Sequence, residues 1–162
     1  MPKLQQLRAD HASAVLTFER TNRAWFANFV SDRGDEFFDR FFEQFGALLA
    51  DQEDGTCILH VLVSEDGTVI GRFNLFELDD SSAVLGYRVA QHVAGRGVAT
   101  ATVQELCELA ASQYGLATLR AATSNDNVAS QKVLIKAGFV PAGSTELVGR
   151  PATWYQRSLS VD

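Results

Sequence analysis

Two glycines on either side of an arginine mark the segment best suited to hold a ligand. In "LGYRVAQHVAGRGVATATVQELCELA", which begins at Leu85, Gly95 and Gly97 stand between a strand-like stretch and a helical one. Glycine lets the backbone approach a ligand closely, and a helix start offers unpaired amide protons at the positive end of the helix dipole. This combination predicts a phosphate cradle, with Arg96 adding charge at its rim. A glycine-rich turn that holds no ligand is the alternative.

Two familiar phosphate-binding sequences are excluded for this segment. A P-loop requires Gly-Lys followed by Ser or Thr, and the sequence contains no such run. A dinucleotide fingerprint requires a third glycine where Thr100 stands, after a strand of a parallel sheet. The strand before this loop instead ends an antiparallel meander.

A second motif lies downstream in "NDNVASQKVLIKAGF", which begins at Asn125. On a helix, Asn127 and Ser130 are three residues apart and share a face. The pattern Asn-x-x-Ser-x-x-Val-Leu-x-Lys-x-Gly-Phe after Gly-x-Gly-x-Ala resembles the GNAT superfamily of acetyl-coenzyme A N-acetyltransferases. The resemblance is closest to the RimJ/RimL-like branch, which contains the ribosomal-protein alanine N-terminal acetyltransferases.

The resemblance covers most of the chain, and the order of the elements matches throughout. It implies one α+β domain, residues 1–162, with the GNAT fold. That fold has a mixed, mostly antiparallel central sheet flanked by helices, with a V-shaped split between the strands near 84–90 and 117–122. Gly86 fits a strand that bends at this point.

The resemblance also implies acetyl-CoA as the cosubstrate. The loop amides would wrap the pyrophosphate of coenzyme A, and the pantetheine arm would lie in the V-shaped gap. A main-chain amide in the strand that precedes the loop would polarise the thioester carbonyl. Many members of the superfamily carry glutamine or arginine three residues before the first loop glycine, where this chain has His92. The implied cofactor-binding residues are Arg88, Val89, Val93, Ala94, Gly95, Arg96, Gly97, Val98, Ala99, Asn127 and Ser130.

Catalysis of acetyl transfer needs an acid and a base. Ser130 could protonate the departing thiolate, although a helix serine that faces solvent or bonds to the backbone is the alternative. An ammonium acceptor must lose a proton before it attacks. Glu146 is the nearest match to the glutamate that some relatives use as the base, at a shorter spacing, and Glu77 is the second candidate. An exposed strand glutamate without a role, and an amine that arrives neutral, remain open.

The acceptor amine is not determined by the sequence. A ribosomal-protein N-terminus, an antibiotic amine, a polyamine and a free amino acid all remain open. A coenzyme-A-binding module without turnover and a nucleotide-binding domain of another kind are the alternative functions. The residues expected to line the acceptor site are Asn22, Trp25, Phe26, Asn74, Tyr87 and Tyr155.

Hydrophobic periodicity predicts the elements that must position these residues. Phenylalanines 38, 41, 42 and 45 with Leu48 and Leu49 form one helical stripe, which favours a core-facing helix over an aromatic ligand site. Asp-Gly at 66–67 and the segment 79–82 predict turns. Asp10 is expected to cap the first helix. The expected helices are 11–20, 35–49, 97–114 and 126–137, and the expected strands are 4–10, 56–64, 68–78, 82–90, 118–123, 139–148 and 152–160.

The composition is that of an ordinary globular protein, with 162 residues, 46% of them hydrophobic and 21% charged. A net charge of −6 argues against nonspecific nucleic-acid binding and favours a neutral or amine-bearing partner. The apolar runs are too short for a membrane span and no signal peptide is visible, so a cytoplasmic location without a membrane partner is expected. The expected assembly is a monomer or a homodimer. The two cysteines are expected to be buried thiols. The three histidines form no metal motif, so no metal is expected.

Overall fold

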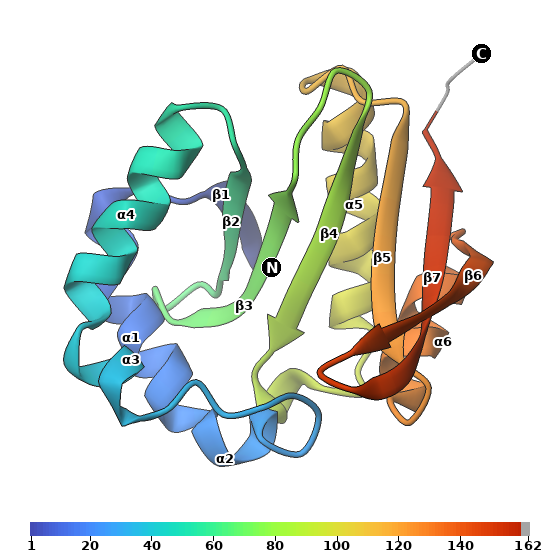
Figure 1. Ribbon diagram of the computed structural model, residues 1–162. Coiled ribbons are helices and arrows are strands. Elements are labelled where there is room, and N and C mark those ends of the chain that lie inside the picture. The colour runs from blue at the N-terminus through green and yellow to red at the C-terminus, as the bar shows by residue number, and fades with distance from the viewer. Residues whose placement is uncertain (160–162) are drawn as a thin grey trace. The chain divides into compact units, whose positions relative to one another are not determined.

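The computed structural model describes residues 1–159, and its elements follow the predicted order (Figure 1). The predicted end of the last strand, Ser160, lies outside the described residues. The helices are α1 (Ala12–Thr21), α2 (Arg23–Phe26), α3 (Asp35–Asp39), α4 (Phe41–Glu53), α5 (Val98–Ser112) and α6 (Val128–Lys136), with 3₁₀ turns η1 (Ala9–His11) and η2 (Gln91–Val93). The strands are β1 (Lys3–Gln6), β2 (Ile58–Val63), β3 (Val69–Phe76), β4 (Ser82–Val89), β5 (Thr118–Ser124), β6 (Val140–Leu147) and β7 (Arg150–Ser158).

The strands form one hydrogen-bonded sheet in the order β1-β2-β3-β4-β5-β7-β6. The pairs β1–β2, β5–β7 and β6–β7 are antiparallel, whereas β4 and β5 are parallel. The parallel pairing joins Ser82–Val84 to Thr118–Arg120, while β5 pairs with β7 from Thr118 to Ser124. The α+β class and the mostly antiparallel sheet predicted from the sequence are therefore confirmed.

The chain divides into two compact units that interleave in sequence. The first comprises residues 1–74 and 87–93, and the second comprises residues 75–86 and those from 94 onward. In the first unit, helices α1 to α4 gather beside strands β1 to β3 (Figure 1). Side chains from both groups build its core, among them Val15, Phe18, Phe41, Phe45, Leu59 and Val61.

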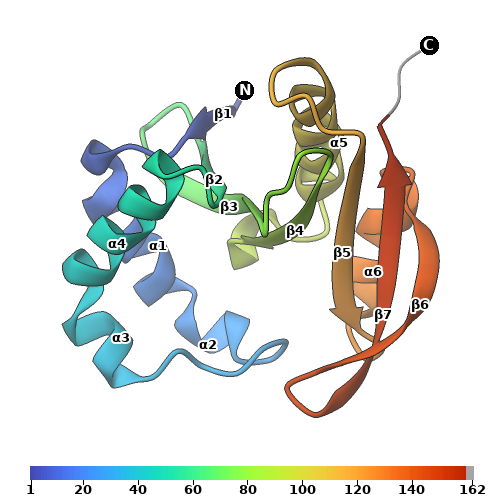
Figure 2. The same ribbon diagram turned by 45° about the horizontal axis from the view of Figure 1, so that its top comes forward.

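The second unit places α5 and α6 against β5 and β7 (Figure 2). Buried and half-buried residues alternate along β5, so that Leu119, Ala121 and Thr123 face the interior. Helix α5 buries residues at helical spacing along one stripe, including Val103, Leu106 and Ala110. Cys107 belongs to the same stripe, and both cysteines are buried free thiols, as predicted.

Two local predictions for the first unit are wrong. Asp10 does not cap α1, because it lies inside η1 and its carboxylate accepts a hydrogen bond from the Arg8 side chain (3.1 Å). His11 is the N-cap residue of α1 and makes no side-chain cap there; its Nδ1 instead accepts the Arg8 amide proton (3.0 Å) at the start of η1. The single helix expected over 35–49 is two helices, broken at Arg40, whose backbone (φ −111°, ψ 21°) is not helical.

This break changes which phenylalanines face the core. Phe41 and Phe45 are buried and stack on each other (5.7 Å between ring centres), whereas Phe42 is 58% exposed. Phe37 packs on the core beside them. The core-facing interpretation of the stripe is thus right for Phe41 and Phe45 and wrong for Phe42.

The two predicted turns form as expected. Gly67 has the positive φ (86°) that the β2–β3 turn requires, and Ser64 accepts its amide proton (2.9 Å). Before β4, the Asp79 carboxylate accepts the amide protons of Ser81 (2.9 Å) and Ser82 (2.7 Å). Both turns fix where the strands that lead to the glycine loop begin.

Candidate active site

The loop between β4 and α5 has the backbone conformation that its glycines suggest. Gly95 (φ 75°) and Gly97 (φ 80°) both lie in the left-handed region, which side-chain-bearing residues rarely adopt. A Cβ atom placed on either glycine would meet nothing within 4 Å. The two glycines therefore set the path of the loop and leave open space beside it.

The start of α5 supplies hydrogen-bond donors at this space. Gly97 is the N-cap residue and has no side chain to cap the helix, and the first intrahelical bond runs from the Ala101 amide to the Gly97 carbonyl (3.1 Å). The amides of Val98, Ala99 and Thr100 consequently lack helical acceptors. Together with the helix dipole, these donors suit an anion such as a pyrophosphate.

The end of β4 presents its main-chain groups in alternation. The Ala90 amide donates to the Ile70 carbonyl (2.9 Å), which lies on β3. Successive residues of a strand point their N–H and C=O groups to opposite sides, so those of Val89 point away from β3 and those of Arg88 point toward it. Of the two predicted main-chain contacts for pantetheine, Val89 is the one with groups directed away from β3.

The Asn127 side chain caps the start of α6. It is the N-cap residue, and its Oδ1 accepts the amide proton of Ser130 (3.1 Å). Both side chains are half-buried. This cap uses the amide oxygen of Asn127 and does not use its Nδ2 protons, which remain suited to donate to a ligand.

The two predicted bases are both exposed glutamates. Glu146 lies near the end of β6, opposite Pro151 of β7. Glu77 follows β3 and has a positive φ (50°). Neither side chain forms a salt bridge with another described residue, so both carboxylates are free of guanidinium or ammonium partners within residues 1–159.

Three of the residues expected to line the acceptor site lie together in the first unit. Asn22 is buried and joins α1 to the chain after β4: its Nδ2 donates to the Phe18 carbonyl (2.9 Å) and its Oδ1 accepts the Gln91 amide proton (2.9 Å). Phe26 is buried against Phe18. Trp25 is half-buried at the edge of the same core.

The other three expected acceptor residues lie on strands. Asn74 on β3 accepts the His60 amide proton (3.2 Å). Tyr87 on β4 stacks on Phe73, with 5.6 Å between ring centres and 7° between planes. Tyr155 on β7 is buried and lies opposite Ala121 of β5. An acceptor role for these six residues stays a prediction.

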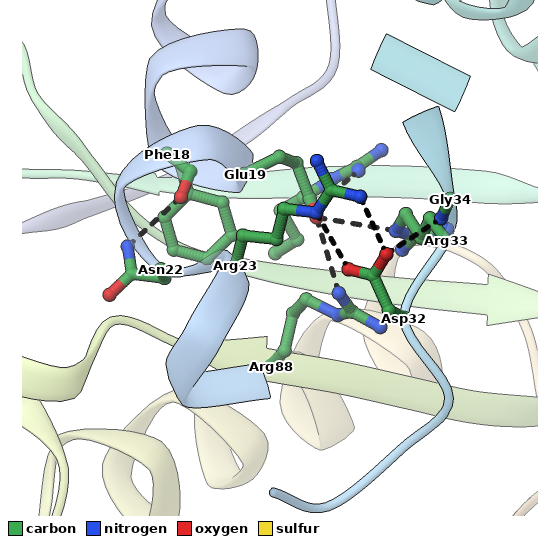
Figure 3. Close-up of polar contacts among 9 residues, drawn as sticks. Phe18, Glu19, Asn22, Arg23, Asp32, Arg33, Gly34 and Arg88 are labelled. Carbon is green, nitrogen blue, oxygen red and sulfur yellow. Dashed lines mark hydrogen bonds and ion pairs between the residues drawn. The ribbon is translucent and has the colours of Figure 1, made fainter. Parts of the chain in front are cut away.

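Sequence reasoning missed a charged cluster around Glu19, which we call the Glu19 cluster (Figure 3). Glu19 is 1% exposed on α1, and its carboxylate accepts hydrogen bonds from Arg72 of β3 (2.9 Å), Arg88 of β4 (3.2 Å) and Arg33 (3.2 Å). The sequence signal was a glutamate four residues after Val15, on the buried stripe of an amphipathic helix.

The guanidinium groups of the Glu19 cluster repel one another. The pKa of Arg88 falls to about 10, first because the group is buried and next because Arg33 lies nearby. Burial likewise lowers the pKa of Arg72, against the attraction of Glu19. The Arg88 guanidinium also lies over the Phe26 ring (4.5 Å to its centre), which holds it in place.

Comparison with known proteins identifies the chain's family. The model of the acetyltransferase (GNAT) domain matches residues 3–140. The chain belongs to the GNAT acetyltransferases. This GNAT chain is therefore an acyltransferase that uses acetyl-CoA as its cosubstrate. A search of curated proteins finds no match.

Solved structures share the fold of this GNAT chain at low sequence identity. The ribosomal-protein-S5-alanine acetyltransferase from Vibrio fischeri has a TM-score of 0.89 at 17% identity, over 97% of this chain and 92% of that one. RimJ from Mycobacterium smegmatis, in complex with a CoA disulfide, has a TM-score of 0.84 at 21% identity, over 96% and 80%. A chimeric spermidine N-acetyltransferase from Vibrio cholerae and hSSAT has a TM-score of 0.81 at 16% identity, over 98% and 95%.

Within residues 1–159, no group of three or more His, Cys, Asp and Glu side chains could hold a metal ion. None of the helices in that part of the chain is both long and apolar enough to cross a membrane.

Proposed function

We propose that this enzyme transfers the acetyl group of acetyl-CoA to a primary amine, on a protein N-terminus or a small molecule, by direct attack of the amine. The observation that carries the proposal is the glycine loop that opens onto the unpaired amides of α5. Its donors and its open space fit the pyrophosphate of coenzyme A. The contacts proposed for this anion are Val93, Ala94, Gly95, Arg96, Gly97, Val98 and Ala99.

Bound acetyl-CoA supplies the acetyl group as an activated thioester. The main chain of Val89 is proposed to hold the pantetheine arm and to donate its amide proton to the thioester carbonyl, where negative charge develops during attack. The short pairing between β4 and β5, which joins Ser82–Val84 to Thr118–Arg120, supports strands that separate beyond it. Asn127 Nδ2 is the proposed side-chain contact of the arm.

Two proton transfers complete the proposed mechanism. Ser130 gives a proton to the thiolate that leaves, and Glu146 takes one from the attacking amine, directly or through one water. Glu77 is the second candidate for the base. The exposure of these two glutamates supports access to an acceptor in solution. The cytoplasmic location expected from the sequence remains a prediction.

The experiment that tests the proposed function has two steps. Calorimetry with acetyl-CoA should first show saturable binding to the intact protein. Release of coenzyme A should then be followed with a panel of N-terminal peptides, polyamines, aminoglycosides and free amino acids. Binding with turnover of at least one amine supports the proposal, and binding without turnover of any amine favours the non-catalytic module. A protein that binds nucleotides but no acetyl-CoA contradicts both.

A further inference from the structure

The Glu19 cluster carries more positive than negative charge. Three guanidinium groups share the single carboxylate of Glu19, and the side chains of Arg33 and Arg88 are 36% and 21% exposed. The nearby carboxylates of Asp32 and Asp35 both accept hydrogen bonds from Arg23 (2.7–2.9 Å). Four guanidinium groups therefore face three carboxylates, in a chain whose net charge is −6.

The excess charge is accessible to solvent. Arg33 donates to Glu19 through Nε, and Arg88 donates through Nη1. Within residues 1–159 the other guanidinium protons of these two arginines form no further hydrogen bond, and no buried side-chain nitrogen or oxygen atom lacks a partner. The remaining donors of Arg88 are therefore reached by solvent, as are those of the more exposed Arg33.

The two accessible arginines are held in position before any ligand arrives. Arg88 lies over the ring of Phe26 (4.5 Å) and Arg33 over the ring of Phe37 (4.8 Å). Both also bond to Glu19, which is almost wholly buried. Fixed guanidinium groups lose little conformational entropy when they bind a carboxylate through paired N–H donors.

The cluster adjoins residues expected to line the acceptor site. Phe26, under the Arg88 guanidinium, is one of them. Asn22 is another: it is the C-cap residue of α1 and lies three residues after Glu19. Tyr87 precedes Arg88 on β4. All of these residues belong to the first unit.

We propose that the Glu19 cluster recognises a carboxylate carried by the acceptor amine, so that the enzyme prefers peptides with an acidic residue close to their N-terminus. The inference rests on the proposed function and names the substrate class of that site. One carboxylate balances the single excess charge that remains when Arg23, Asp32 and Asp35 are counted with the cluster, and it matches the planar guanidinium fork. A polyamine carries the opposite charge, and the cluster disfavours it.

The test compares two tetrapeptide amides in binding to the full-length protein. Both begin with alanine, and the second and third positions are glutamates in one peptide and glutamines in the other. Binding is followed through the guanidinium Nε–H NMR signals of Arg33 and Arg88, so it needs no turnover. We expect saturable shifts with the glutamate peptide and a Kd about tenfold lower than with the glutamine peptide. This ratio is at the lower end of the affinity gain expected from charge-assisted hydrogen bonds. Spermidine should produce no saturable shift of either signal.

Variants of exposed arginines separate the cluster from general surface charge. In Arg33→Gln the tenfold preference should fall to about twofold or less, as read from the Arg88 signal. Arg33→Lys keeps the positive charge but lacks the planar guanidinium fork, so it should retain part of the preference for the acidic peptide. The matched control is Arg40→Gln, because Arg40 is an exposed arginine that contacts Glu36 and Glu43 instead of Glu19. It should retain the full preference.

The inference would be overturned by equal Kd values for the two peptides, or by an acidic preference that survives intact in Arg33→Gln. Saturable spermidine binding at the arginine signals would also contradict it. Acetyl-CoA binding, measured by calorimetry on the same samples, reports separately on the proposed function. Its absence from the wild-type protein contradicts that function, while the peptide comparison still decides whether the cluster binds a carboxylate.

Discussion

The carboxylate of Glu19 and the guanidinium of Arg72 lie 2.9 Å apart, and their side chains are only 1% and 6% exposed. An ion pair this deeply buried contributes little when intact, because desolvation offsets the attraction between the charges. Removing one partner is costly, because the other charge stays buried without compensation. The Glu19 cluster is therefore a point at which small substitutions have large effects.

Glu19→Gln should lower the free energy of unfolding by about 3 kcal/mol or more, the cost typical of a broken buried pair. Urea unfolding followed by circular dichroism measures this change. Glu43→Gln is the control, because Glu43 pairs with Arg40 at the surface, where both side chains are more than half exposed. If the two variants lose similar stability, the buried cluster has no special energetic role.

Gly97→Asn should weaken acetyl-CoA binding at least about tenfold, because asparagine tolerates a positive φ but fills the space beside the loop. Gly115→Asn is a matched control: Gly115 also has a positive φ (67°) and nothing within 4 Å of a Cβ. Calorimetry should show unchanged binding for this control. Unchanged affinity in Gly97→Asn as well would remove the loop from the proposed site.

Substitutions at Asn127 can separate its cap from a role in binding. Asn127→Ala loses the cap, which is worth about 1 kcal/mol, whereas Asn127→Asp keeps an acceptor for the Ser130 amide and loses the Nδ2 donor. If the donor binds pantetheine, both variants should raise the KM for acetyl-CoA several-fold. If Asn127→Asp keeps the wild-type KM for acetyl-CoA, Asn127 caps α6 and does not bind pantetheine.

Ser130→Ala tests the proposed acid on the same helix. Protonation of the leaving thiolate matters only as the transition state forms, so kcat should fall while the KM for acetyl-CoA stays close to the wild-type value. Steady-state kinetics with an acceptor found in the amine panel provide both constants. A wild-type kcat would exclude Ser130 as the acid.

The proposed base predicts a pH-dependent defect. General-base catalysis is typically worth about 10²–10⁴-fold, so Glu146→Gln should lose at least about tenfold in kcat/KM near neutral pH. The loss should shrink at high pH, where the amine is already neutral. Glu77→Gln, measured over the same pH range, tests the second candidate. If both variants match the wild type at every pH, neither glutamate is the base.

His60 should make stability depend on pH. It is 2% exposed, and its Nδ1 donates to the Phe73 carbonyl (3.1 Å), while burial lowers its pKa from 6.5 to about 4. The unfolded chain therefore binds a proton at a higher pH than the folded protein does. Stability should fall by at most about 3 kcal/mol as the pH drops from 6.5 to 4. Denaturant unfolding across this range measures how steeply the free energy of unfolding changes with pH. His60→Gln should reduce this slope, whereas His92→Gln, at an exposed histidine, should preserve it.

Features that depend on neighbouring residues could be predicted from the sequence. The positive φ values at Gly67, Gly95 and Gly97 follow from the residue type and from the elements that flank each glycine. The order of helices and strands follows from hydrophobic periodicity in the same way. The helix break at Arg40 was missed because arginine is a good helix former and nothing in its local sequence signals a stop.

Features that depend on distant residues could not be predicted. Glu19 meets Arg72 and Arg88 across 53 and 69 residues of sequence, and only the register of β3 and β4 brings them together. The direction of the Val89 amide depends on the same register, through the bond between Ala90 and Ile70. For these residues the side-chain type was visible in the sequence, but the partner was not.

Strand β4 belongs to both units, with Ser82–Gly86 in the second and Tyr87–Val89 in the first. Neither unit is one continuous piece of sequence, so no single cut of the chain releases either unit whole. On the ribosome, residues 75–86 of the second unit emerge before residues 87–93, which complete the first. Synthesis of the second unit thus begins before the first is complete, and the two cannot fold as independent domains made one after the other.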